Sequence, residues 1–431
     1  MRASRTFAVS LLLVLSWGAA GAAAQTAADL FNPNVLHRVD LIVSSRDWEK
    51  LKAAYQTNEY YAATLKWQGL TVQNIGIRSR GLGSRSQSKP GLRVDINRYA
   101  SGQEFLGLKS FILDNLWQDP SGLKEAMAMR LFARMNLPAP RESFAMLYVN
   151  SQYAGLYVIV ESIDKTMLGR VFGEKDGDTE NDGFLFEYNY KEGSPWFFTY
   201  LGANFASYKE LFSPKTHEND SEWDLYHEIE SMVRTVNEAR DDMFVSSMAA
   251  YLDLSLFMKH VGVQAFLAEW DGILGYAGMN NFYLYRFEKQ TVSQFIAWDA
   301  DNTFRAIEYS TLSGHQENVL MRRAMLVPEL KAAFFDAVLA AEASAAEPDP
   351  LEVPLPGQAP RGWLEREITT TYDLIRTAAR SDVLKPYTND EFEAAIADLQ
   401  TFARERGAYV KCEVVKNTDP AKAGTVCPPG G

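Results

Sequence analysis

The sequence has little of what would build a thiol or zinc centre. Among 431 residues there are two cysteines and five histidines, and the histidines show none of the spacings typical of zinc ligands. Histidine-based zinc or nucleophile chemistry and a catalytic thiol therefore have little support. Both cysteines, Cys412 and Cys427, lie in a C-terminal stretch with several prolines and glycines. We expect a disulfide between them that staples an otherwise loose tail.

Long apolar runs are also missing after the N-terminus. No later stretch approaches the roughly 18 to 20 apolar residues that cross a bilayer. Residues 1–24 read as a secretory signal peptide, because Arg2 and Arg5 precede an apolar run from Phe7 to Leu15, and Ala22–Ala24 end the segment. We predict a protein that is secreted, periplasmic or at the cell surface, with no transmembrane segment after signal cleavage. An uncleaved anchor is the alternative.

The chain has fewer basic than acidic residues. Removing the two arginines of the signal segment from 43 basic residues leaves 41 against 55 acidic residues, a net charge of −14. An acidic surface argues against nucleic acid and anionic membranes as partners, since phosphate contacts need clustered Lys and Arg. A basic protein as the partner would suit such a surface better.

The distribution of apolar residues predicts an α+β protein of more than one part. Hydrophobic residues make up 47% of the chain, enough for a sizeable core. We expect a sheet-rich N-terminal lobe over 25–162 and a more helical lobe over 163–345. Five prolines predict a linker or long loop over 346–362. C-terminal helices and the cysteine-containing tail follow over 363–431.

Local patterns predict individual elements of these parts. Alternating apolar residues predict paired strands at 60–67 and 70–78, and a second hairpin at 144–149 and 155–160. Asp119-Pro120 is typical of a helix start. Apolar residues at helical spacing predict further helices over 254–268, 363–379 and 390–406.

Polar residues flank two strand-like runs in the second lobe. Asn281 opens the run that contains Phe282–Tyr285, and Asp299 and Asp301 follow the run that contains Phe295–Trp298. If the runs pair, these side chains lie at the ends of neighbouring strands. Carboxylate and amide oxygens suit Mg²⁺ or another hard divalent cation better than zinc. The alternative is a hairpin whose Asp and Asn residues only form turns.

Two other features are candidates for phosphate chemistry. The loop Arg78–Lys89 combines four cations with glycines and serines between two strands, which would suit phosphate groups. It lacks the spacing of a Walker loop, and a flexible basic surface loop is the alternative reading. Asp271 stands where a predicted helix passes into a loop. Loops often carry catalytic and binding residues.

Four segments together resemble the spore-coat H (CotH) kinase family of atypical protein kinases. The first is the basic loop, and the second is a hairpin of the form Leu-Tyr-Val-Asn-x-x-Tyr-x-Gly-Leu-Tyr-x-x-x-Glu. The third and fourth are the Asn-Asn-Phe-Tyr-Leu-Tyr and Trp-Asp-x-Asp-x-x-Phe blocks. They follow one another in the family's order at Arg80, Gly81, Ser84 and Lys89, at Leu147–Glu161, at Asn280–Tyr285 and at Trp298–Phe304.

The resemblance implies a two-lobed, divergent protein-kinase-like fold with ATP between the lobes. Lys89 would reach the nucleotide phosphates, as a strand lysine does in ordinary kinases. Arg80 and Ser84 belong to the same phosphate-binding block. Glu161, at the end of the hairpin where the lobes join, would line the nucleotide pocket or form an ion pair there. A hinge residue with a local salt bridge is the equal alternative.

The same resemblance assigns the chemistry to the second lobe. Asp271 would be the catalytic residue that receives the hydrogen bond of the substrate hydroxyl. Asn281, Asp299 and Asp301 would hold Mg²⁺ on the phosphates. The implied function is transfer of the ATP γ-phosphate to Ser or Thr of exported proteins.

Two positions depart from the family pattern. Arg305 stands where relatives carry Gly, and Pro90-Gly91 follows Lys89 where relatives continue with Lys. These departures leave a non-catalytic surface-binding or adhesion protein as the second reading. A third reading takes Asp271, Asp299 and Asp301 as carboxylates of a secreted glycosidase, with aromatic segments such as Pro195–Tyr200 lining a sugar cleft. The basic loop has no role in that reading.

Overall fold

The computed structural model describes residues 24–175, 178–354 and 359–427. The segment predicted as a signal peptide lies outside these residues except for its last position. Among the residues that are described, no helix has both the length and the apolar character needed to cross a membrane.

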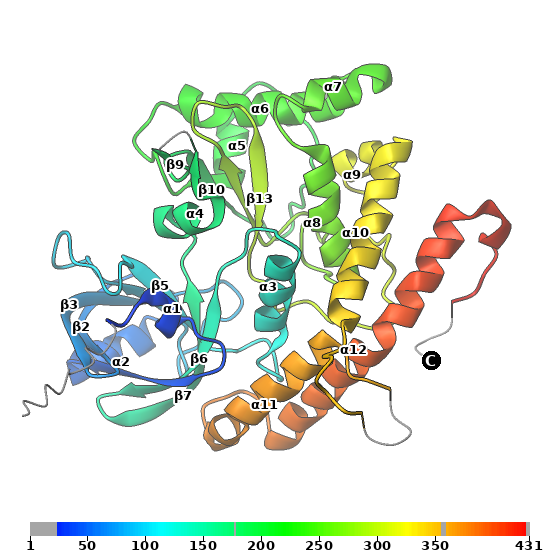
Figure 1. Cartoon of the computed structure of the whole chain (residues 1–431). Coiled ribbons are helices and arrows are strands. Elements are labelled where there is room, and N and C mark those ends of the chain that lie inside the picture. Colours follow the sequence, from blue (N-terminus) through cyan, green and yellow to red (C-terminus); the bar gives the residue numbers. More distant parts are fainter. Residues whose placement is uncertain (1–23, 176–177, 355–358, 428–431) are drawn as a thin grey trace, which may run out of the picture.

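The N-terminal part is a closed barrel (Figure 1). Its strands follow the order β1-β2-β3-β4-β5-β7-β6, and β1 closes the barrel by pairing with β6 in parallel. Apolar side chains that alternate along the strands fill the interior, as Val39, Leu41 and Val43 do in β1. The strands are β1 (Leu36–Val43), β2 (Tyr61–Trp67), β3 (Leu70–Ser79), β4 (Leu92–Asp95), β5 (Ser110–Asp114), β6 (Glu142–Val149) and β7 (Gln152–Glu161).

Three helices accompany the barrel: α1 (Ala27–Leu30), α2 (Ser45–Ala53) and α3 (Lys124–Arg134). Both predicted hairpins are present as β2–β3 and β6–β7. The helix expected to start at Asp119-Pro120 begins instead at Lys124. The carboxylate of Asp119 first closes a turn by accepting from the amide of Ser121, and it then accepts from the amide of Lys124 at 2.9 Å.

The second part combines a four-stranded sheet with helices. The sheet has the order β11-β10-β12-β13, and its core is distinct from the core inside the barrel. The strands are β8 (Glu174–Lys175), β9 (Asp178–Thr179), β10 (Phe184–Tyr188), β11 (Phe212–Pro214), β12 (Phe282–Arg286) and β13 (Ser293–Ala297). The helices are α4 (Lys165–Phe172), α5 (Phe205–Leu211), α6 (Glu222–Glu238), α7 (Phe244–Met248), α8 (Leu254–Phe266), α9 (Val319–Ala324) and α10 (Pro328–Ala346).

The α+β class predicted from the sequence is confirmed. The sheet-rich N-terminal lobe is a closed barrel, which does not by itself establish a kinase-like lobe. The closing contact, β1 with β6, joins strands far apart in the chain, and alternation within one strand carries no information about such a partner.

Two long helices complete the chain. α11 (Trp363–Ser381) packs against β7 and α3, and α12 (Asn389–Thr418) packs against α10 and α11 (Figure 1). α12 continues well beyond the predicted end at 406 and buries Val410 and Val414. Between α10 and α11, the described residues of the proline-rich segment form neither helix nor strand apart from one bridge between Pro348 and Gly362.

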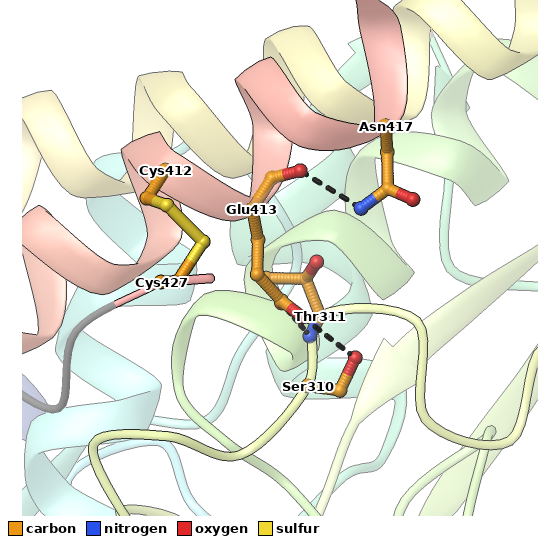
Figure 2. The surroundings of a disulfide bond; sticks show 6 residues. All are labelled: Ser310, Thr311, Cys412, Glu413, Asn417 and Cys427. Atoms are coloured by element: carbon orange, nitrogen blue, oxygen red, sulfur yellow. Dashed lines mark hydrogen bonds between the residues drawn. A yellow bond between two sulfur atoms is a disulfide. The ribbon is translucent and has the colours of Figure 1, made fainter. Parts of the chain in front are cut away.

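The predicted disulfide joins Cys412 of α12 to Cys427 (Figure 2). Cys412 therefore belongs to a packed helix, and only the segment after α12 is a tail. The helix has its own attachment beside the disulfide, because the carboxylate of Glu413 accepts from the amide of Thr311 at 2.6 Å and from the hydroxyl of Ser310 at 3.0 Å.

Reduction of the disulfide should therefore act locally. In the chain-entropy account a loop of this size contributes on the order of 3 kcal/mol to the structure it closes. We expect reduction to raise hydrogen exchange in residues after Thr418 and to leave α12 protected, which mass spectrometry of peptic fragments measures. Loss of protection in α9 or α10 would contradict a local role.

Candidate active site

A cleft of about 690 Å³ lies between the loop that follows β3 and the second sheet. It brings together residues that are distant in the sequence and that the sequence analysis selected from separate motifs. Those that line it are Arg80, Ser84, Asp271, Asn281, Asp299 and Asp301. Lys89 and Glu161 are not among the lining residues.

Strand pairing places the polar residues of the second sheet. β12 and β13 are antiparallel neighbours, with Phe282 opposite Ala297. Asn281 directly precedes β12 and Asp299 follows β13, so both stand at the same edge, as predicted. Each has a left-handed backbone, with φ of 56° for Asn281 and 51° for Asp299. Asn and Asp tolerate this conformation better than other residues with side chains, and it is common at functional sites.

Asp271 follows the end of α8 and faces two amides. Its Oδ2 accepts hydrogen bonds from Asn280 Nδ2 and Asn281 Nδ2, both at 3.2 Å. Burial raises the pKa of Asp271, and the two amide hydrogen bonds act in the opposite direction. The carboxylate is thus oriented and partly shielded from water while it still lines the cleft. Such a group can accept a proton from a substrate hydroxyl.

The two aspartates after β13 are crowded with like charges. Burial raises the pKa of Asp299 to about 6, against the attraction of Arg80. Burial and the neighbouring Asp299 also raise the pKa of Asp301. Bringing a cation to this edge would relieve the repulsion.

The residues at this edge fit Mg²⁺ by their chemistry. Asp299 and Asp301 supply carboxylates, and Asn281 donates through Nδ2 to Asp271, which leaves its carbonyl oxygen as a donor for a metal. In the described part of the chain, no group of three or more His, Cys, Asp or Glu residues forms a complete metal cage. A pair of carboxylates completed by phosphate oxygens and water is the usual way in which proteins hold Mg²⁺ on a nucleotide.

The basic loop is organised by its own contacts. Gly81 has φ of 106°, and a Cβ there would stand 2.4 Å from Ser84 Oγ, so the turn requires glycine. Arg85 donates to the carbonyl of Gly81 at 2.7 Å. Arg80 extends to the cleft, where its Nη1 lies 3.1 Å from Asp114 Oδ2 and its guanidinium lies 5.6 Å from the ring centre of Trp298. Arg80 is also the cation of this loop whose charge acts on Asp299.

Lys89 has a different environment from the one that the resemblance implied. Its side chain is 1% exposed, and its Nζ lies 2.7 Å from Oδ2 of Asp382, which is 2% exposed and caps the end of α11. Burial lowers the pKa of Lys89, and Asp382 works against that effect. The structure does not bring Lys89 to Asp299 and Asp301. Its role toward a nucleotide therefore stays a prediction.

Glu161 forms ion pairs rather than lining the cleft. Its carboxylate lies 2.7 Å from Nη2 of Arg141 and 2.5 Å from Nη2 of Arg170, and it also accepts from the amide of Arg141 at 3.0 Å. Glu161 thus forms the ion pairs that both sequence readings allowed, at the junction between β7 and α4, and it does not line the cleft.

Comparison with known proteins agrees with this set of motifs. The model of the CotH kinase protein family matches residues 77–410, which covers most of the chain. This chain belongs to that family. The inner spore coat protein H of Bacillus subtilis (strain 168) is 22% identical over 395 residues, covering 90% of this chain and 96% of that protein. The invasin CotH3 of Rhizopus delemar is 22% identical over 247 residues, covering 54% of this chain and 38% of the invasin.

The structure places further acidic residues beside the cleft that the sequence did not indicate. A small pocket of about 20 Å³ lies beside the cleft and is lined by Asp114, Glu125, Asp299 and Asp301 among others. Asp114 ends β5, so the argument that selected Asp299 could have selected it too. Glu125 lies in the first turn of α3, where acidic residues are common for other reasons. Nothing in the sequence indicated a functional role for Asp382, because an aspartate at the end of a helix has many ordinary roles.

The buried pair of Lys89 and Asp382 gives a stability prediction. Because removing one partner leaves the other charge buried without compensation, Lys89→Met should lower the free energy of unfolding by about 3 to 5 kcal/mol. Urea unfolding measures this change. Lys385→Met serves as the control, since Lys385 donates to the backbone oxygen of Asp382 from a less buried position. A Lys89→Met protein of unchanged stability that has lost ATP binding would instead assign Lys89 to the nucleotide.

Glu142, the first residue of β6, gives a prediction about pH. Both of its carboxylate oxygens are buried without a hydrogen-bond partner among the described residues. Burial raises its pKa from the ordinary 4.5 to about 8, with Arg130 opposing the shift. Between these two pH values the unfolded chain has lost the proton that the folded protein keeps, so this group makes the protein less stable as pH rises.

Glu142→Gln removes that contribution. We expect its urea midpoint to exceed that of the natural protein at pH 8, and the difference to shrink toward pH 4.5. Equal dependence on pH in the two proteins would show that Glu142 does not carry this proton.

Proposed function

We propose that this chain is an exported CotH-type kinase that transfers the γ-phosphoryl group of ATP to a Ser or Thr hydroxyl of an exported protein. Membership of the CotH kinase protein family supports the reaction class. Relatives named as a spore coat protein and an invasin support a location outside the cytoplasm or at a surface.

One observation carries the proposal. A single cleft joins a glycine-containing basic loop from the barrel to a carboxylate cluster from the second sheet. Phosphoryl transfer needs cations on one side of the triphosphate and oxygen ligands for Mg²⁺ on the other, because catalysis depends on positioning and on neutralising charge. The amides and carboxylate around Asp271 provide a place for the acceptor hydroxyl beside both.

Each residue has a role that follows from its surroundings. Asp299, Asp301 and the carbonyl of Asn281 would hold Mg²⁺, which would neutralise the charge of the phosphates. Arg80 would bind the phosphates from the opposite wall, with Ser84 beside it. Asp271 would orient the acceptor hydroxyl and take its proton as the acceptor oxygen bonds to the γ-phosphorus and the bond to the ADP oxygen breaks.

A non-catalytic binding protein is the second candidate. The observation that favours it is the pairing of Lys89 with Asp382, which leaves the lysine of the family motif outside the cleft. A protein that retains the fold and binds a nucleotide or a divalent cation without turnover would also suit a surface or adhesion role. Binding of ATP without phosphoryl transfer would distinguish it.

The glycosidase reading loses its supporting feature. Trp196 and Phe198 of the aromatic segment Pro195–Tyr200 are buried in the hydrophobic core and do not line the cleft. Trp196 packs on Tyr188 and Phe212, and Phe198 stacks on Trp196, so neither forms the wall of a sugar site there.

Two substitutions test the kinase proposal. Asp299→Ala should abolish incorporation of labelled phosphate from ATP and Mg²⁺, because it removes a metal ligand. Asp271→Asn should lower kcat by about 10²- to 10⁴-fold, because it removes proton acceptance, and should keep the thermal shift caused by ATP and Mg²⁺. The measurements are radiolabel transfer to a Ser/Thr-rich protein and a melting curve with and without nucleotide.

Asp398→Asn is the control, since Asp398 is an exposed acid on α12 away from the cleft. It should match the natural protein in both measurements. Full phosphate incorporation by folded Asp299→Ala, or an absence of any nucleotide shift in the natural protein, would reject the kinase proposal.

A further inference from the structure

The segment that delivers Asp271 to the cleft begins with a strained helix end. α8 ends at Phe266, and Ala268, two residues later, lies in the left-handed region at φ of 53°. The amide of Glu269 donates back to the carbonyl of Gln264 at 3.0 Å. Glycine usually occupies such a position, because a side chain there costs about 1 to 2 kcal/mol. The contacts that follow Ala268 must therefore hold this turn in place.

Glu269, the residue after Ala268, contacts the backbone of Asp271. Its side chain is buried, with 7% exposed, and Oε1 accepts the hydrogen bond of the Asp271 amide at 3.0 Å. Glu269 does not line the cleft. It therefore holds the backbone of Asp271 from behind, while Asn280 and Asn281 hold the carboxylate from the cleft side.

Gly272 allows this arrangement. A Cβ at this position would stand 2.5 Å from Gln264 Nε2 and 2.7 Å from Glu269 Cγ. The side-chain oxygen of Gln264 accepts from the amide of Ile273 at 3.3 Å. Gln264 of α8 and Glu269 just after that helix thus enclose the turn 271–273, and they leave room only for glycine at its centre.

α12 fixes the same helix end from the other side. Arg406, fully buried, donates from Nε to the carbonyl of Phe266 at 3.0 Å and from Nη2 to the carbonyl of Ala265 at 2.7 Å. A cation at the C-terminus of a helix is favourable, because it faces the free carbonyl groups there. The end of α8 is consequently a rigid base for the turn.

We propose that Glu269 is a positioning residue for Asp271, which acts by accepting the Asp271 backbone N–H and so fixes the direction of the Asp271 carboxylate. The kinetic part of this inference rests on the proposed kinase function, whereas the structural part does not. Neither family motifs nor the spacing of the acidic residues assigns a role to Glu269.

The environment of Glu269 predicts which substitution preserves its role. Burial raises the pKa of Glu269 to about 8, so at neutral pH the side chain is mostly a neutral carboxyl group. Its carbonyl oxygen still accepts a hydrogen bond in that form. Glutamine has the same shape and offers the same acceptor, whereas alanine has none.

The test compares Glu269→Ala and Glu269→Gln in the full chain. In Glu269→Ala, exchange of the amides over residues 270–274 should become about fivefold faster, because one hydrogen bond of roughly 1 kcal/mol is lost. The same variant should lose about 10- to 100-fold in kcat with ATP and Mg²⁺ while the KM for ATP stays unchanged, since only the catalytic geometry is disturbed. Glu269→Gln should keep both exchange and kcat within about threefold of the natural protein.

Glu413→Ala is the matched control. Glu413 is also 7% exposed and also accepts a loop amide, that of Thr311, but Thr311 does not line the cleft, whereas Asp271 does. It should leave exchange over 270–274 and kcat unchanged. Unchanged exchange in Glu269→Ala, or a loss in Glu269→Gln equal to that in Glu269→Ala, would overturn the positioning role. If the natural protein transfers no phosphate, the kinase proposal fails and exchange alone decides the inference.

Discussion

The ion pair between Lys89 and Asp382 is the interaction that connects the N-terminal barrel to the C-terminal helices. It joins the end of the basic loop to the end of α11, and both side chains are shielded from water. Asp382 also accepts from the amide of Leu156 at 3.0 Å, and it approaches β7 so closely that a Cβ on Gly155 would stand 2.5 Å from its Oδ2. Because a buried pair costs desolvation, this geometry must be complete to be stable. The barrel, the loop and the C-terminal helices are therefore fixed as one arrangement.

The C-terminal helices support both walls of the cleft. Through Asp382, α11 holds the loop that carries Arg80 and Ser84. Through Arg406, α12 holds the end of α8 that leads to Asp271. Helices that the sequence suggested as additions to a two-lobed core are thus part of the support of the site. The family match over residues 77–410 includes α11 and most of α12, in agreement with this dependence.

Local patterns in the sequence predicted the elements but not their distant partners. The β12–β13 pair could be predicted because alternation and polar flanks are local properties, and the same pairing placed Asn281 and Asp299 correctly. Barrel closure could not be predicted, because it depends on the parallel pairing of β1 with β6. The partner of Lys89 was equally hidden, since a charged residue in a loop does not reveal which distant charge will meet it. Glu269 went unnoticed because its effect passes through a backbone amide.

The attachment of α12 to α8 has a consequence for the order of folding. Arg406 lies far along the chain from the carbonyl groups that it binds, and contacts of large sequence separation form late because their loop-closure entropy must be overcome first. The barrel can form from residues that emerge early during synthesis, whereas the base of the cleft is complete only after the last long helix has docked. A chain threaded through a narrow channel from its N-terminus would cross with its cleft unassembled, and any chemistry that needs the cleft would begin on the far side.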